Sequence, residues 1–252
     1  MKGLISEKLR KRLWEITKKE MGDFYNDKAH GREHLKAVYK NFIILLKEKP
    51  KISKDILESL ECAVIIHDIG RVVKNNEKHG AESVKILKEE KNLILPNKEW
   101  VFYAVKWHSE CGKIFKKQKT EPKKNKERWL CLAFLALLDH MDAVGKRVIK
   151  RAKEYLPQQN FGKKVPLIPE ESPHLKLKNI DNLKEWFLNP QRENISPERK
   201  NKSLLEHLCA NYFWTDKNIF LVKKRISKKF EQNYRKRAKE LEKYILNLAT
   251  RE

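Results

Sequence analysis

Residues 130–138 read LCLAFLALL, nine consecutive positions without a polar side chain, and Asp139 follows directly. A helix that is apolar on every side is normally surrounded by protein, so we place the helix that contains this segment at the centre of the fold. The segment is about half of the ~20 residues that a membrane-spanning helix needs, so we expect no membrane partner. A carboxylate at the end of such a segment is costly to bury unless a cation or hydrogen bonds meet it.

The same helical periodicity runs through most of the chain. Apolar side chains recur at helical spacing in segments that we place at about residues 4–21, 32–50, 53–66, 80–91, 96–107, 127–155, 200–213 and 217–249. Ser53 is the expected N-cap of the third helix, and Gly70 is its expected stop signal. No segment alternates β-branched and polar side chains, so the predicted fold class is all-α.

The proline content of the chain rises after this helical region. Six of the nine prolines fall between residues 157 and 197, which predicts an irregular connection around one short helix near residues 183–188. Residues 113–126 predict a lysine-rich loop. We interpret residues 1–156 as a helical catalytic-type domain, and residues 157–252 as a basic, helical C-terminal extension packed on it.

Positive charge dominates the sequence, with 57 Lys and Arg against 34 Asp and Glu and a formal net charge of +23. Such an excess favours polyanionic partners, namely nucleic acid, nucleotides or an anionic membrane surface. Residues 113–128 hold eight basic and two acidic side chains, and residues 223–239 hold nine basic and one acidic. The alternative for both stretches is an ordinary solvated surface.

The four cysteines are widely spaced and form no C-x-x-C pair. This usage indicates reduced thiols, not a disulfide framework or a zinc knuckle. The first twenty residues read as a charged amphipathic helix without the apolar core of a secretion signal. Both features favour a cytoplasmic protein.

Four histidines and two aspartates stand where helix packing alone does not require them. They begin or end predicted helices, and they are His34, His67, Asp68, His79, His108 and Asp139. Imidazole and carboxylate together suit manganese, iron, nickel, cobalt or zinc better than calcium, which prefers an all-oxygen shell. The pattern therefore predicts a site for a divalent transition metal.

The order His, His-Asp, His, His, Asp resembles that of the HD-domain superfamily of metal-dependent phosphohydrolases. The resemblance covers roughly residues 23–147, and it implies an antiparallel helical bundle. His34, His67, Asp68 and Asp139 match the defining pattern, and His79 and His108 match the extra histidines of members that hold two metals. The resemblance implies that Asp68 bridges two ions, with His34, His67 and Asp139 on one ion and His79 and His108 on the other.

Four of these side chains also have a structural alternative. His34 can be a polar helix-start residue, and Asp139 can form an ion pair with Arg147. His79 can be a solvated loop residue, and His108 can cap the C-terminus of a helix.

The same resemblance implies that a metal-bound hydroxide attacks phosphorus, which leaves phosphate oxygens in need of a cation. Arg71 follows the His-Asp doublet where the family usually has lysine, and its planar guanidinium can hold two phosphate oxygens. We therefore predict Asp68 and Arg71 as catalytic residues. The candidate substrate-binding residues are Arg71, His30, Lys106, Lys146 and Arg147.

The leading hypothesis is a metal-dependent phosphohydrolase, a phosphomonoesterase or phosphodiesterase. It would act on ester or anhydride bonds of nucleotides or related small phosphate compounds. The alternative is a metal-dependent nuclease that acts on single-stranded nucleic acid, like the HD nuclease of CRISPR interference systems. A third possibility is a non-catalytic nucleic-acid-binding protein, which the intact set of candidate ligands disfavours.

Overall fold

The computed structural model describes residues 3–27, 30–73, 78–117, 121–145, 147–152, 180–188 and 203–249. Every regular element in these ranges is helical, and none of them contains a β-strand, which confirms the all-α prediction. The chain divides into two compact units, Met1–Met141 with Asn218–Glu231, and Asp142–Lys217 with Gln232–Glu252. The predicted domain boundary near residue 156 stays a prediction, because residues 153–179 lie outside the described ranges.

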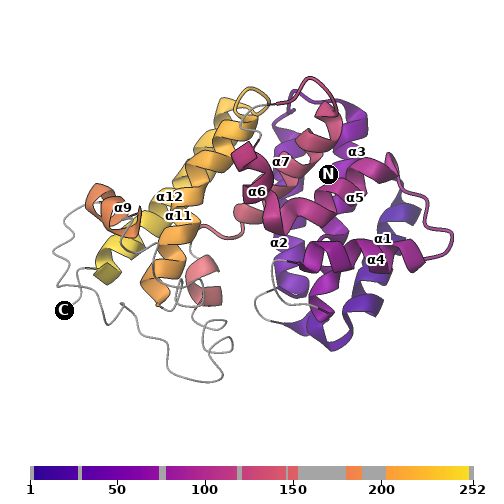
Figure 1. The fold of residues 1–252 in the computed structure, drawn as a ribbon, viewed down its shortest axis with the longest axis horizontal. Helices are drawn as coiled ribbons and strands as arrows, with labels where there is room; N and C mark the ends of the chain where they lie inside the picture. The colour runs from indigo at the N-terminus through magenta and orange to yellow at the C-terminus, as the bar shows by residue number, and fades with distance from the viewer. Residues whose placement is uncertain are drawn as a thin grey trace. The chain divides into compact units, whose positions relative to one another are not determined.

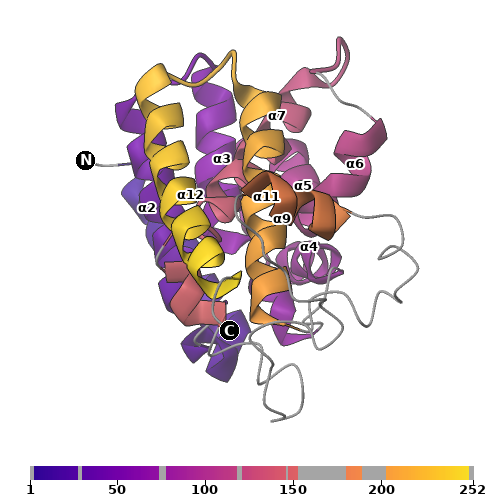
Figure 2. The same cartoon turned by 90° about the vertical axis from the view of Figure 1, so that its left-hand side faces the viewer.

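The helices of the first unit carry most of the sequence up to residue 141 (Figure 1). They are α1 (Glu7–Met21), η1 (Gly22–Asn26), α2 (Arg32–Lys47), α3 (Lys54–Ile66), η2 (Ile69–Val72), α4 (His79–Glu89), α5 (Lys98–Trp107), η3 (His108–Glu110), α6 (Cys111–Lys117) and α7 (Lys126–His140). The later helices are α9 (Ile180–Leu188), α11 (Leu204–Val222) and α12 (Lys228–Ala249). Figure 2 shows α12 beside α11.

Helix α7 lies at the centre of the first unit, where it packs against α2, α3 and α5. All ten side chains from Trp129 to Leu138 are buried, which agrees with the prediction from the apolar segment. Because a helix without a polar face needs protein on all sides, the neighbouring helices are arranged around it. The end of α7 therefore brings Asp139 into the interior of the bundle.

A short polar side chain begins the third predicted helix, as the sequence predicts. Ser53 Oγ accepts a hydrogen bond from the backbone N–H of Ile56 at 3.3 Å, so it is the N-cap of α3. Helix α3 ends at Ile66, however, four residues before Gly70. Gly70 does not adopt a left-handed backbone conformation, so the predicted role of Gly70 as a helix stop is wrong.

Three predicted boundaries also differ from the structure. Part of the expected lysine-rich loop is helix α6, because Phe115 is buried against Trp129 with ring centroids 5.7 Å apart. Helix α7 ends at His140, and helix resumes at residues 147–152 after Gly145, which has a φ of +88°. The break between the last two helices lies at residues 223–227 instead of 214–216, because Ser227 Oγ accepts from the Phe230 N–H and caps α12.

A buried carboxylate in α3 joins the first three helices. Glu61 is fully buried, and it accepts hydrogen bonds from the backbone N–H groups of Leu4 and Ile5, from Arg10 Nε at 2.7 Å and from the Tyr39 hydroxyl at 2.9 Å. These bonds connect α1 and α2 to α3. They hold in place the helices that carry the first candidate ligands.

No helix in the described ranges combines the length and the apolar character that crossing a bilayer demands.

We expect Phe134→Ala to lower the free energy of unfolding by about 3–5 kcal/mol, because Phe134 is fully buried in α7 and the change leaves a cavity. Ile94→Ala is the control, since Ile94 is 84% exposed and its loss should change the free energy by less than about 0.5 kcal/mol. Urea denaturation of both variants measures the difference. Equal effects of the two changes would contradict the central position of α7.

Candidate metal centre

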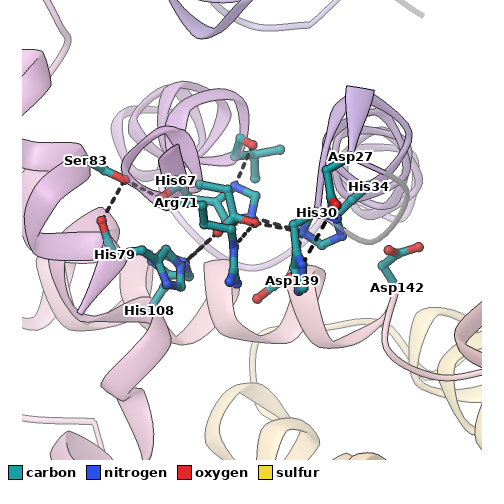
Figure 3. Close-up of polar contacts among 12 residues, drawn as sticks. Asp27, His30, His34, His67, Arg71, His79, Ser83, His108, Asp139 and Asp142 are labelled. Atoms are coloured by element: carbon teal, nitrogen blue, oxygen red, sulfur yellow. Dashed lines mark hydrogen bonds and ion pairs between the residues drawn. The ribbon is translucent and has the colours of Figure 1, made fainter. Parts of the chain in front are cut away.

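Six side chains from separate elements of the first unit meet in one buried place (Figure 3). All lie at or near a helix end, and they are His34 in α2, His67 and Asp68 between α3 and η2, His79 at the start of α4, His108 at the start of η3, and Asp139 in α7. The five residues other than Asp139 are at most 4% exposed, and the Asp139 side chain is 32% exposed. The centre is thus open to solvent on the Asp139 side.

Asp68 occupies the middle of this cluster. Its Oδ1 lies 2.9 Å from His79 Nε2 and 3.3 Å from His108 Nε2. Its Oδ2 lies 3.5 Å from His34 Nε2 on the other side. Oδ1 also lies 3.8 Å from His67 Nε2, so Oδ1 faces three imidazoles, whereas Oδ2 faces the fourth imidazole and Arg71.

The distances between the donor atoms agree with a shared metal shell. His34 Nε2 lies 3.2 Å from Asp139 Oδ1 and 3.4 Å from His67 Nε2, and the Nε2 atoms of His79 and His108 are 2.8 Å apart. Metal–ligand bonds of about 2.1 Å place neighbouring ligand atoms roughly 3.0–3.4 Å apart. Two sets of three residues meet the spacing for a metal ion, namely His34, His67 and Asp139, and His67, Asp68 and His108.

Hydrogen bonds to the backbone orient two of the imidazole rings. His67 Nδ1 lies 3.0 Å from the Val64 carbonyl oxygen, and His108 Nδ1 lies 2.7 Å from the Val105 carbonyl oxygen. A carbonyl oxygen only accepts, so Nδ1 carries the proton, and in the neutral ring the Nε2 lone pair points into the centre. Burial lowers the pKa of His67 despite the nearby carboxylates, which favours this neutral form.

The carboxylates of the centre are ionised. Burial alone would raise the pKa of Asp68, but the positive charge of Arg71 and the neighbouring imidazoles hold that pKa well below its usual range. Arg71 Nε lies 2.7 Å from Asp68 Oδ2. For Asp139, the hydrogen bond and charge of His34 outweigh burial and lower the pKa.

Together these groups form a good binding site for a cation. The imidazole nitrogens lie close to one another and to two ionised carboxylates, so a cation at this place would find both nitrogen and oxygen donors. The mixture of nitrogen and oxygen donors fits a divalent transition metal better than calcium.

Ser83, which we did not predict as a site residue, connects the His-Asp segment to α4. Its Oγ accepts from the Gly70 N–H at 2.8 Å and lies 2.8 Å from the His67 carbonyl oxygen and 3.1 Å from that of His79. The hydroxyl therefore links the backbones on both sides of Asp68. This contact holds His79 opposite the carboxylate.

Two glycines permit the close approach of these backbones. A Cβ on Gly70 would lie 2.1 Å from the His79 carbonyl oxygen, and a Cβ on Gly80 would lie 2.4 Å from that of Val105. Both distances are far shorter than atoms tolerate, so no other residue fits without a shift of the backbone. The start of α4 can reach both Asp68 and His108 because these positions have no side chain.

A buried amide supports the other half of the centre. Asn41 Nδ2 in α2 donates to the Leu138 carbonyl oxygen at 3.0 Å, one residue before Asp139. This bond fixes α2 against the end of α7 and keeps His34 opposite Asp139. Asn41 interrupts an apolar stripe of α2, which is the one sign of its role in the sequence.

Of the predicted substrate-binding residues, two lie next to candidate metal ligands. Arg71 contacts Asp68, and the His30 ring lies 5.9 Å from the His34 ring while its backbone N–H donates to Asp27. Lys106 is exposed, with Nζ 4.7 Å from the centre of the Trp107 ring. Lys146 lies outside the described residues.

Arg147 forms an ion pair at 2.7 Å with Asp142 in the second unit. The predicted alternative, an ion pair between Asp139 and Arg147, is therefore not the contact that the structure shows. Asp139 Oδ1 lies 3.2 Å from His34 Nε2 instead. The alternative of a solvated His79 is wrong, because that side chain is 2% exposed.

A family model described as HD domain matches residues 17–152, more than half of the chain. The chain belongs to the HD domain family. This confirms the family expected from the residue pattern, and the matched region contains all six candidate ligands and Arg71. HD domains bind divalent metals, and the family consists broadly of metal-dependent phosphohydrolases. No curated protein and no solved structure matches the chain.

We expect Ser83→Ala to lower the free energy of unfolding of this HD domain by about 1–3 kcal/mol, because it leaves the buried N–H of Gly70 without its acceptor. Hydrogen exchange at the Gly70 amide should be faster, and the free energy of opening calculated from its rate should fall by a similar amount. Denaturation and exchange of the variant measure both effects. An unchanged exchange rate at Gly70 would show that Ser83 does not hold the two backbones together.

Proposed function

We propose that this HD domain hydrolyses phosphate ester or anhydride bonds of nucleotides or related small phosphate compounds. The observation that carries this proposal is the position of Asp68, whose carboxylate oxygens lie within 3.8 Å of all four candidate histidine ligands. Centres that hold two cations close together are suited to in-line displacement at phosphorus. The proposed enzyme is a phosphomonoesterase or phosphodiesterase.

The proposed cofactor is a pair of divalent transition-metal ions, drawn from manganese, iron, nickel, cobalt or zinc. His34, His67 and Asp139 would hold one ion, and His79 and His108 would hold the other. Asp68 would contribute an oxygen to each. When bound, such ions supply an activated water as nucleophile and neutralise charge on the phosphoryl group.

The residues of the chain have separate proposed roles around this pair. Asp68 stays ionised next to Arg71 and can share its charge between the two positions. The backbone bonds of His67 and His108 fix the direction of their Nε2 atoms. These features reduce the movement that the centre needs when a substrate arrives, which lowers the cost of reaching the transition state.

Arg71 is the proposed contact for the phosphoryl oxygens. Its side chain is 14% exposed and lies against Asp68, so a phosphate that reaches the centre also comes within reach of the guanidinium. A guanidinium offers several donors in one plane and can hold two phosphate oxygens, which a lysine ammonium cannot do in the same geometry. His30, Lys106, Lys146 and Arg147 stay predictions as further substrate contacts.

The nuclease alternative uses the same centre and differs in the length of the substrate. The net charge of +23 supports binding of a polyanion. A nuclease that contacts many phosphates should bind more weakly as salt rises, whereas the KM of a nucleotide hydrolase should change little. Measuring KM or Kd against salt for both substrate types distinguishes the two hypotheses.

The proposed enzyme is cytoplasmic and has two domains. All four cysteines are free thiols, and three of them are buried, which supports a cytoplasmic location. We keep residues 1–156 as the catalytic domain and residues 157–252 as a basic C-terminal extension.

The first test is the metal content of protein purified without added metal, assayed on the same sample against nucleotides and single-stranded DNA. We expect close to two transition-metal ions per chain, together with turnover. An absence of bound metal, with no activity after addition of manganese, iron, nickel or cobalt, would contradict the proposal and favour a binding protein.

We expect Asp68→Ala and His67→Ala to abolish hydrolysis and to lower metal content, because each removes a proposed ligand at the middle of the centre. Circular dichroism should stay close to that of the original protein. Asp55→Ala is the control, because Asp55 is an exposed carboxylate in the first turn of α3 and should keep full activity. Full activity in a metal-depleted Asp68→Ala protein would exclude the proposed mechanism.

We expect Arg71→Ala to lower kcat/KM by about 10- to 100-fold, because a hydrogen bond to a charged group contributes roughly 1.5–3 kcal/mol. Arg71→Lys should recover part of this loss by keeping the charge without the planar fork. Metal content should stay at two ions per chain in both variants. A lower metal content would show instead that Arg71 acts by holding Asp68 in place.

A further inference from the structure

Helix α12 has two opposite faces of different chemistry. One face is apolar and buried, with Phe230, Tyr234, Leu241 and Ile245 each fully buried. The helix is therefore anchored in the protein along most of its length, and the opposite face is presented to solvent.

The solvent-facing positions of α12 form a basic stripe. At 100° per residue, six exposed side chains fall within about 100° of the helix circumference, and we call them the α12 basic face: Lys228, Gln232, Arg235, Lys236, Lys239 and Lys243. Five of the six are cationic, and none is acidic. The fifteen-residue separation from first to last corresponds to about 22 Å along the helix axis.

Like charges are neighbours along this face. Arg235, Lys239 and Lys243 repeat at a spacing of four residues, where like charges repel and destabilise the helix. Arg235 pairs with Asp216 at 2.7 Å, but no carboxylate of the described residues forms an ion pair with the four lysines of this face. Helix α1 exposes Glu7 and Glu15 among its lysines, whereas the three glutamates of α12 are only partly exposed.

We propose that the α12 basic face binds the phosphate backbone of a nucleic-acid strand. One strand of duplex DNA carries one phosphate per about 3.4 Å of axis, so roughly six phosphates lie along the ~22 Å of this face. The exposed side chains of this face include no carboxylate, and apart from Arg235, which pairs with Asp216, its cations can meet a row of phosphates. The face shares no residue with the candidate metal centre, so binding does not require the proposed hydrolysis.

Other partners fit this face less well. A helix that lies on a membrane buries an apolar face in the bilayer, whereas the apolar face of α12 is buried in the protein core. A protein partner normally needs apolar or aromatic anchor residues at the centre of its interface. The six side chains of the α12 basic face include none.

The test is fluorescence anisotropy of a labelled 20-nucleotide DNA, single-stranded or duplex, titrated with the full chain in EDTA at several salt concentrations. Contacts from five cations predict a slope of log Kd against log salt of about 3.5 for a single strand and about 4.5 for a duplex. The triple variant Lys236→Gln/Lys239→Gln/Lys243→Gln should reduce this slope by about 2 for the single strand and about 2.7 for the duplex.

The matched control removes three lysines of α1, in Lys8→Gln/Lys11→Gln/Lys18→Gln, which are exposed and lie on a helix of mixed charge. This control should change the slope by less than 1, although the net charge falls equally. Asp68→Ala should bind DNA like the original protein, so a failure of the proposed hydrolysis would leave this result standing.

Two outcomes would overturn the inference. Equal loss of binding in the α12 and α1 variants would show that net charge alone attracts DNA. Absence of DNA binding at low salt, together with binding to vesicles that contain phosphatidylserine or to an acidic peptide, would assign the α12 basic face to another partner.

Discussion

The charge of one buried carboxylate organises the centre of this HD domain. Asp68 is fully buried, yet its pKa lies well below the usual range, because Arg71 and the imidazoles around it outweigh the cost of burial. A buried ion of this kind needs partners on every side. Those partners come from α2, α4, η2 and η3, so these elements must converge on the end of α3.

The convergence depends on backbone contacts as much as on the side chains that face the centre. Gly70 and Gly80 allow α4 to approach at distances that a Cβ would prevent, and Ser83 then joins the two backbones by hydrogen bonds. The Asn41 side chain likewise joins α2 to α7 by its hydrogen bond to the Leu138 carbonyl oxygen. The apolar helix α7 provides the rigid base against which these contacts hold, since its residues 129–138 are all buried.

Negative and positive charge are distributed differently in this protein. The metal centre collects ionised carboxylates in a buried position, which suits small divalent cations. The chain as a whole has a net charge of +23, and the α12 basic face displays part of it in a regular row. A large positive net charge attracts polyanions over a distance, which is consistent with the proposed phosphate-containing substrates.

The sequence by itself determined the helices and the candidate ligands, because both leave local signs. Periodic apolar residues and the Ser53 cap define helices within a few turns of chain, and histidines or aspartates at the ends of apolar helices are costly unless something binds them. Only the tertiary structure decided the rest. It showed that Phe115 makes residues 111–117 helical and that Gly80 and Asn41 support the centre, because their roles depend on atoms distant in sequence, such as Trp129, the Val105 carbonyl and the Leu138 carbonyl.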